Sequence, residues 1–105
     1  MISVGFFSEM NITAHNDGSV KDYICEKVDY DKSLIIKYLS SFSRYAVCPR
    51  YTIDCVTGET ISSCFRVYDD GEYCWPDFLI YHIEKYNIKL PQDFINRIQA
   101  KTAQQ

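Results

Sequence analysis

The sequence predicts an α+β domain in which an antiparallel sheet of three to four strands, arranged as a meander, packs against N-terminal and C-terminal helices. Two observations predict this fold. β-Branched and aromatic residues separated by glycine turns fill the centre of the chain, and apolar residues at helical spacing precede and follow it. Because 105 residues that are 47% hydrophobic suffice for one core, residues 1–105 are expected to form a single domain.

The first part of the chain is expected to hold a short strand and two helices. Residues 2–7 are apolar enough for the strand. Ser19, with a carboxylate three residues later, matches the start of a helix predicted over residues 19–27. Asp29 or Asp31 is expected to cap a second helix. The apolar stripe of this second helix contains Leu34, Ile35, Tyr38, Leu39 and Phe42.

The centre of the chain predicts the strands of the sheet. Residues 45–48 are expected to be extended because Pro49 disfavours helix in the residue before it. Residues 51–56 and 60–68 flank a glycine turn and predict a hairpin, and an Asp-Gly turn then leads to a third strand at residues 72–75. One face of the second strand is expected to carry Ile61, Ser63, Phe65 and Val67.

Two proline-led helices are expected after the sheet. Pro76 suits the first turn of a helix, Asp77 lies near its positive end, and Asn87 is expected to end it. Its apolar stripe contains Phe78, Leu79, His82, Ile83 and Tyr86. Pro91 starts the last helix, with Phe94, Ile95 and Ile98 facing inward. Trp75 lies at the strand-to-helix junction and is expected to be the hub of the core.

Composition limits the partners and the location of the protein. Lys and Arg number 11 against 14 Asp and Glu, and the net charge of −3 is the wrong sign for nucleic acid and better suited to a basic protein. The N-terminus reaches Glu9 without a basic leader, and no apolar run approaches the roughly 20 residues that span a bilayer. We therefore expect a cytoplasmic protein without a membrane segment.

The cysteine pattern predicts packed, reduced thiols. The five cysteines, an odd number without a Cys-x-x-Cys pair, are Cys25, Cys48, Cys55, Cys64 and Cys74. Neither a disulfide framework nor a zinc site has this spacing. The four glycines are isolated, so no phosphate-binding loop is predicted either. We therefore expect neither a metal nor another cofactor.

Nucleophilic catalysis would need a thiol or hydroxyl beside an oriented base. The two imidazoles of the chain are His15, in a predicted loop, and His82, on an apolar helix stripe where a packed ring is expected. A thiol-dependent hydrolase or transferase that uses Cys74 or Cys64 with His82 is an alternative function.

An acidic cluster at residues 69–72 adjoins aromatic side chains. Two interpretations are open: a solvated turn, or a protein-binding edge whose acids meet Lys or Arg and whose rings are anchors. The following helix would continue such an edge. The candidate partner-binding residues are Tyr68, Asp69, Asp70, Glu72, Tyr73, Asp77, Tyr81 and Glu84.

Three short segments carry a family resemblance: Asp70-Gly71-x-Tyr73-x-Trp75, Glu84-Lys85-Tyr86 and Leu90-Pro91-x-x-Phe94. This pattern resembles small bacterial immunity proteins of contact-dependent inhibition and related polymorphic toxin systems. The resemblance implies a non-enzymatic cytoplasmic protein that binds a cognate toxin C-terminal domain, commonly a nuclease, and neutralises it. It assigns no contact residues, because immunity proteins bind through surfaces specific to each pair. An adaptor subunit of another assembly is a further alternative.

Overall fold

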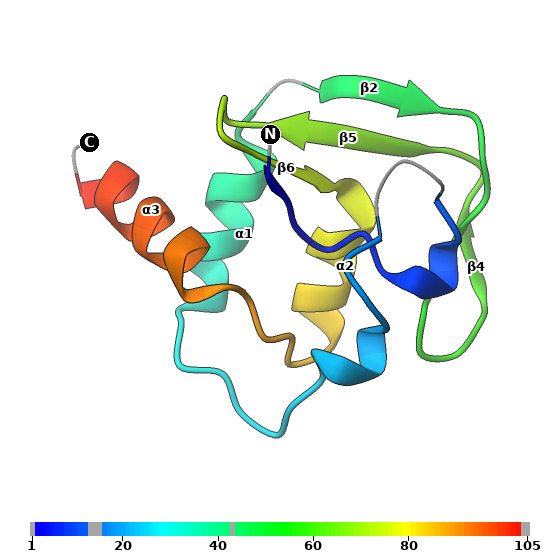
Figure 1. The fold of residues 1–105 in the computed structure, drawn as a ribbon, viewed down its shortest axis with the longest axis horizontal. Helices are drawn as coiled ribbons and strands as arrows, with labels where there is room; N and C mark the ends of the chain where they lie inside the picture. Colours follow the sequence, from blue (N-terminus) through cyan, green and yellow to red (C-terminus); the bar gives the residue numbers. More distant parts are fainter. Residues whose placement is uncertain (1, 13–15, 43, 104–105) are drawn as a thin grey trace.

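The structure is a computed structural model that describes residues 2–12, 16–42 and 44–103. It confirms an α+β fold, and Figure 1 shows strands β2, β5 and β6 at the top of the view with the three α-helices below them. The elements in chain order are β1 (Ile2–Ser3), the 3-10 helices η1 (Ser8–Met10) and η2 (Val20–Asp22), α1 (Lys32–Ser40), β2 (Arg44–Cys48), β3 (Thr52–Ile53), β4 (Thr60–Ser62), β5 (Phe65–Asp69), β6 (Tyr73–Pro76), α2 (Asp77–Lys85) and α3 (Gln92–Ala103).

The main sheet has four strands in the order β1-β6-β5-β2. Strand β5 is antiparallel to β6, as predicted for the meander, and also to β2, which takes the place of the partner predicted at residues 51–56. Strand β1 is parallel to β6, so the prediction of an entirely antiparallel sheet is wrong and the sheet is mixed. Parallel neighbours need a long connection. Residues 4–72, about two-thirds of the chain, separate β1 from β6, and no local turn signal could have revealed their pairing.

Strands β3 and β4 form a separate two-stranded sheet, which we call the ribbon. The predicted hairpin is therefore confirmed only near its turn, because the second strand breaks after Ser62. The Ser62 hydroxyl donates to the Cys64 carbonyl at 2.9 Å and accepts from the Cys64 amide at 3.3 Å, which redirects the chain. Phe65 and Val67 are buried as expected, but Ile61, on the other side of the break, is 39% exposed.

The helix predicted over residues 19–27 is a single 3-10 turn, η2. Ser19 caps this turn, as predicted from its hydroxyl. Beyond the turn, the backbone of Ile24 forms an isolated antiparallel bridge with Ile88. A long-range backbone pairing has thus replaced the helical turns that the local sequence favours.

The three α-helices follow their sequence signals closely. Asp31, rather than Asp29, caps α1 by accepting hydrogen bonds from the amides of the first helical turn. Helix α2 ends at Lys85, just before the predicted stop at Asn87. The predicted inward side chains of α2 and α3 that are buried are Phe78, Leu79, His82, Ile83, Phe94, Ile95 and Ile98.

Trp75 is the hub of the core, as predicted. Its side chain is 0% exposed, and its indole N–H donates to the Leu39 carbonyl at 3.2 Å. Its ring lies 5.7 Å from that of Phe42 and 5.8 Å from that of Phe94, centroid to centroid. Trp75 therefore joins β6 to the α1 and α3 regions of the chain.

Replacing Trp75 with alanine is expected to lower the free energy of unfolding by about 3–5 kcal/mol, because it leaves a cavity between the sheet and two helices. Urea denaturation followed by circular dichroism measures the change. Tyr51→Ala is the matched control, since that ring is 69% exposed and its loss should change stability by under about 0.5 kcal/mol. Equal midpoints for the two variants would contradict this account of the core.

Candidate interaction surface

The acidic turn between β5 and β6 is partly buried. The side chain of Asp70 is 1% exposed and forms a 2.8 Å ion pair with the guanidinium of Arg97 in α3. The Tyr38 hydroxyl of α1 donates to the same carboxylate at 2.6 Å. The interpretation of a solvated turn is therefore wrong for Asp70, because two helices from distant parts of the chain cover it.

The Asp70 carboxylate is also bonded within its own turn. Its Oδ1 accepts the amides of Glu72 at 3.0 Å and Tyr73 at 2.8 Å. Burial disfavours the charged form, but the bonds from Arg97, Tyr38 and the two amides outweigh it and lower the pKa of Asp70 to about 2. The carboxylate stays ionised at neutral pH, and both of its oxygens accept hydrogen bonds from groups inside the fold.

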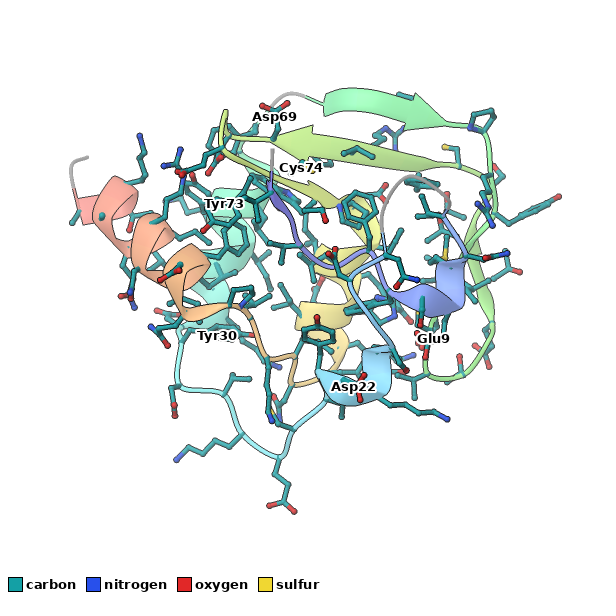
Figure 2. The ribbon with its side chains drawn as sticks, in the orientation of Figure 1. Glu9, Asp22, Tyr30, Asp69, Tyr73 and Cys74 are labelled. Atoms are coloured by element: carbon teal, nitrogen blue, oxygen red, sulfur yellow. The ribbon has the colours of Figure 1, made fainter. Side chains whose placement is uncertain are left out.

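The other predicted residues near this turn differ in exposure. The side chain of Glu72 is 54% exposed, although its carboxylate lies 2.5 Å from Arg97. Tyr73 is buried, and its ring lies 4.7 Å from that of Phe94. Tyr68 and Asp69 are half-buried. Figure 2 shows Asp69 at the turn and Tyr73 directed toward α3. Glu72 is therefore the side chain here that is most accessible to a partner.

The remaining three predicted residues lie on α2 in a different environment. Asp77 is 4.0 Å from Arg66, and burial raises the pKa of the Asp77 carboxyl. Tyr81 donates a hydrogen bond to Asp54. Glu84 is exposed. The structure thus divides the eight candidates between the β5–β6 turn and α2, and it brings one of them, Tyr81, to a carboxylate that sequence reasoning missed.

That missed carboxylate is Asp54, whose side chain is 1% exposed. Its Oδ2 accepts the hydroxyls of Tyr81 at 2.8 Å and Tyr86 at 2.7 Å, and the Lys85 ammonium lies 3.4 Å away. Its Oδ1 accepts the amides of residues 56 and 57. The sequence signal for this arrangement was an Asp three residues before Thr57-Gly58. An Asp side chain in that position typically closes its own turn by accepting backbone amides.

The Asp54 cluster fixes the ribbon loop to α2. Burial of Asp54 disfavours its charged form, but the bonds from Tyr86, Tyr81 and the two amides outweigh it and hold the pKa of Asp54 well below its usual range. The hydrogen bond that the Lys85 ammonium donates to the Tyr81 hydroxyl is the first factor that raises the pKa of Lys85. Lys85 and Tyr86, two members of the segment that suggested a family, therefore have a structural role.

His82 is a packed core residue, as predicted. It is 0% exposed; its Nε2 accepts the Cys55 amide at 2.9 Å, and its Nδ1 lies 2.6 Å from the Phe78 carbonyl. A neutral ring with its proton on Nδ1 satisfies both contacts, and burial lowers the pKa of His82. Both ring nitrogens are therefore occupied, which leaves neither to activate a thiol of Cys74 or Cys64.

The described cysteines are free thiols, as predicted. Cys55 and Cys74 are buried, whereas Cys25 and Cys64 are half-buried. Burial raises the pKa of Cys55 to about 12 and also raises that of Cys74, which is opposite to the shift that activates a nucleophile. The side chain of Cys48 and all of His15 lie outside the described residues. Within that described part, no group of three or more His, Cys, Asp or Glu could hold a metal ion.

Exposed apolar side chains are concentrated in one stretch of the sequence, from β2 to the second strand of the ribbon. Among the described residues, four of the six exposed large hydrophobic side chains fall between positions 47 and 61. A cavity of about 200 Å³ lies between the ribbon and the start of α2, lined by Thr52, Ile61, Ser62, Asp77, Phe78 and Tyr81. We call Val47, Tyr51, Val56 and Ile61 the ribbon surface. The sequence did not reveal this surface, because Val47 and Ile61 belong to predicted strands, and a strand of this kind is expected to bury one of its faces.

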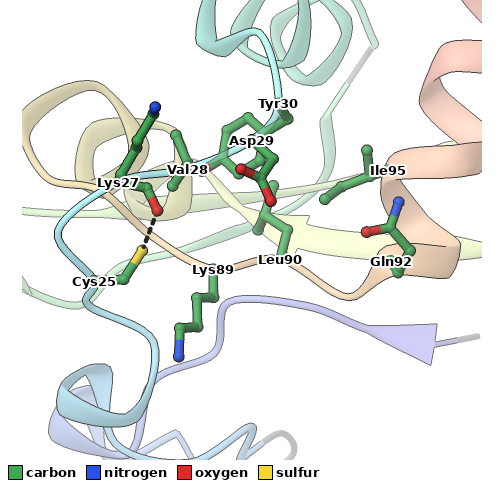
Figure 3. A pocket seen from close by; sticks show the side chains of 9 residues that line it. All are labelled: Cys25, Lys27, Val28, Asp29, Tyr30, Lys89, Leu90, Gln92 and Ile95. Carbon is green, nitrogen blue, oxygen red and sulfur yellow. Dashed lines mark hydrogen bonds between the residues drawn. The ribbon is translucent and has the colours of Figure 1, made fainter.

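A second groove, of about 280 Å³, lies between residues 25–30 and 89–95. Figure 3 shows its lining side chains, with those of Lys27 and Lys89 extending to opposite sides. The Cys25 thiol donates to the Lys27 carbonyl at 3.2 Å. The two cations do not converge on one position, so this groove does not have the arrangement of an anion site.

Comparison of the chain with protein-family models, curated protein sequences and solved structures gave no match. In the portion of the chain that the structure describes, no helix has both the length and the apolar character needed to cross a membrane.

The Asp70 ion pair predicts an acid-dependent loss of stability. Because the folded pKa of about 2 lies below the ordinary 3.8, the stabilisation is complete above about pH 4 and is lost as the pH falls through 2. The lowered pKa of Asp70 contributes about 2 kcal/mol to the free energy of unfolding at neutral pH. Urea titrations from pH 7 to 2 should show the stability advantage of the wild type over Asp70→Asn shrinking in that window. A pH-independent difference would contradict the assignment.

Thiol labelling tests the alternative enzymatic function. In the native protein, Cys55 and Cys74 should remain unmodified by iodoacetamide at pH 7, because burial keeps them protonated and inaccessible. Mass spectrometry of time points identifies the modified residues. Rapid, selective labelling of Cys64 or Cys74 that His82→Gln abolishes without unfolding would support the enzyme instead.

Proposed function

We propose that this protein is a cytoplasmic immunity protein, which binds a cognate toxin domain, most simply a nuclease, and neutralises it without chemistry of its own. The three-segment resemblance supports this proposal. Within the fold, Trp75 and Phe94 from those segments pack in the core, and Lys85 and Tyr86 hold Asp54. These four resembling residues therefore maintain the scaffold, which leaves contact specificity to exposed positions.

The ribbon surface is the observation that carries the proposal. Its members Val47 and Tyr51 are 50% and 69% exposed, and they lie in a chain whose buried carboxylates, imidazole and thiols serve the fold. Exposed apolar side chains can serve as contacts in a protein-binding surface, and aromatic residues are the usual anchors. A protein that keeps Asp54, Asp70 and His82 bonded within the fold while it exposes several apolar side chains is suited to occupying another protein.

Electrostatics support a basic partner. The net charge of −3 favours encounter with a positively charged protein, such as a domain that itself binds nucleic acid. Burial removes Asp70 and Tyr73 from the proposed contacts. Glu72 and Glu84 are exposed and keep the proposed role, and Tyr68, Asp69, Asp77 and Tyr81 keep it as partly exposed side chains.

Co-expression tests the proposal. The partner to use is the C-terminal domain of a large secreted protein encoded next to this gene in its genome. We expect the two chains to co-purify as a complex and the toxic activity of the domain to disappear. A folded, active toxin domain that is neither bound nor inhibited would contradict the proposed function.

Reversing the exposed charges of the β5–β6 turn should slow association. We expect the double variant Asp69→Lys, Glu72→Lys to reduce the association rate about tenfold at low salt and to weaken its salt dependence. Stopped-flow fluorescence with the toxin domain measures both quantities. Asp22→Lys, Glu26→Lys is the matched control, because it changes the net charge equally at two other exposed acids. Equal slowing by both double variants would remove the turn from the contact surface.

A further inference from the structure

Strand β2 forms an open edge of the main sheet. It is the outermost of the four strands, has β5 as its single neighbour within the described sheet, and lies along the top of Figure 1. It is five residues long, whereas β1 at the opposite edge has two. An edge strand presents backbone N–H and C=O groups to which another extended chain can pair.

Apolar contact area adjoins this edge. Val47 lies within β2, and the chain continues directly from β2 through Pro49 to the exposed ring of Tyr51 before it enters the ribbon. A further cavity, separate from the one between the ribbon and α2, lies beside the Tyr51 ring and has a volume of about 300 Å³. It is lined by Glu9, Met10, Asn11, Arg50, Tyr51 and Ile53. An added strand would therefore gain backbone hydrogen bonds along β2 and an aromatic anchor at its end.

The local charge differs from that of the whole protein. Three of the four arginines, Arg44, Arg50 and Arg66, fall between positions 44 and 68, in a chain whose net charge is −3. The two acids in that stretch are Glu59 and Asp54. The negative charge of Asp54 is paired with Lys85 inside its buried cluster. Arg50 is exposed, and the side chain of Arg66 is 41% exposed. Arg66 lies on the neighbouring strand β5 and 4.0 Å from Asp77, so the exposed Arg50 is the main described cation beside the edge, and it is complementary to a carboxylate.

This charge also decides between two occupants of the edge. If two copies paired their β2 strands, the arginines at positions 44 and 50 of both copies would be brought to one interface. Like charges directly opposite one another are destabilising in a sheet. The repulsion between these like charges disfavours self-pairing and favours a different chain that carries acids.

We propose that the open edge of β2 binds an extended, carboxylate-bearing segment of the toxin domain as an added strand, with Tyr51 as its aromatic anchor. This inference rests on the proposed function and names the surface and the partner segment. The acidic turn steers a basic region of the partner, and the arginine-flanked edge receives an acidic strand. The two contacts use opposite charges and fix the orientation of the complex.

Hydrogen exchange of the complex tests the proposed pairing. With the co-purified toxin domain bound, amides of residues 44–48 that are open in the free protein should exchange at least tenfold more slowly, as expected for new inter-strand hydrogen bonds. Mass spectrometry with overlapping peptides reads this directly. A bound complex without slowing at 44–48 would overturn the inference alone. A toxin domain that does not bind would overturn the proposed function, and this inference with it.

Matched variants provide the second test. Val47→Glu places a carboxylate on the edge and should weaken binding of the toxin domain at least tenfold, whereas Ile24→Glu makes the same change at a side chain that is 37% exposed elsewhere and should leave binding unchanged. Melting temperatures verify that both variants fold. Equal affinities for the two variants, or a dimer of the free protein in ultracentrifugation that Val47→Glu dissociates, would overturn the proposal.

Discussion

The ionised carboxylate of Asp54 is the contact on which the shape of the proposed binding surface depends. A two-stranded sheet with strands as short as β3 and β4 is not stable alone. The ribbon persists because Asp54 accepts hydrogen bonds from Tyr81 and Tyr86 of the α2 region, and because the amide of the next residue donates to His82. These bonds hold the ribbon loop against α2 and so keep Val56 and Ile61 at the surface.

Asp70 repeats the same principle at the other end of the molecule. Like Asp54, it is a turn carboxylate that closes its own turn through backbone amides and also receives groups from distant helices. A buried charge is stable only when it is paired and hydrogen-bonded, and both carboxylates meet this condition. The acids that seem most available for chemistry in the sequence are therefore components of the scaffold. Four of the six large apolar side chains that are exposed among the described residues fall instead between positions 47 and 61.

The sequence predicted the elements whose signals are local. The cap at Asp31, the apolar stripes of α2 and α3 and the return strand to Trp75 depend on residues within a few positions of one another. The predictions that failed concern pairings between residues far apart in the sequence. The parallel pairing of β1 and the bridge of Ile24 to Ile88 have no local signature, and the bridge overrides a favourable helix start.

The candidate site shows the same division. Asp70 was identified as an acid at a turn, but its partner Arg97 is 27 residues away, and Asp54 is 32 residues from Tyr86. Such partners can be found only once the fold is known. The ribbon surface depends in turn on a strand break made by Ser62, which is a matter of side-chain geometry rather than of composition. The identity of the partner stays a prediction from resemblance.

The central claim is that this protein acts by occupying another polypeptide, with one molecule neutralising one target. Titration of a fixed amount of the active toxin domain with the purified protein tests that claim most directly. The account predicts that toxic activity falls linearly and reaches zero at an equimolar ratio. Complete loss of activity at a small fraction of an equivalent would show repeated turnover by each molecule, and it would contradict a mechanism based on binding.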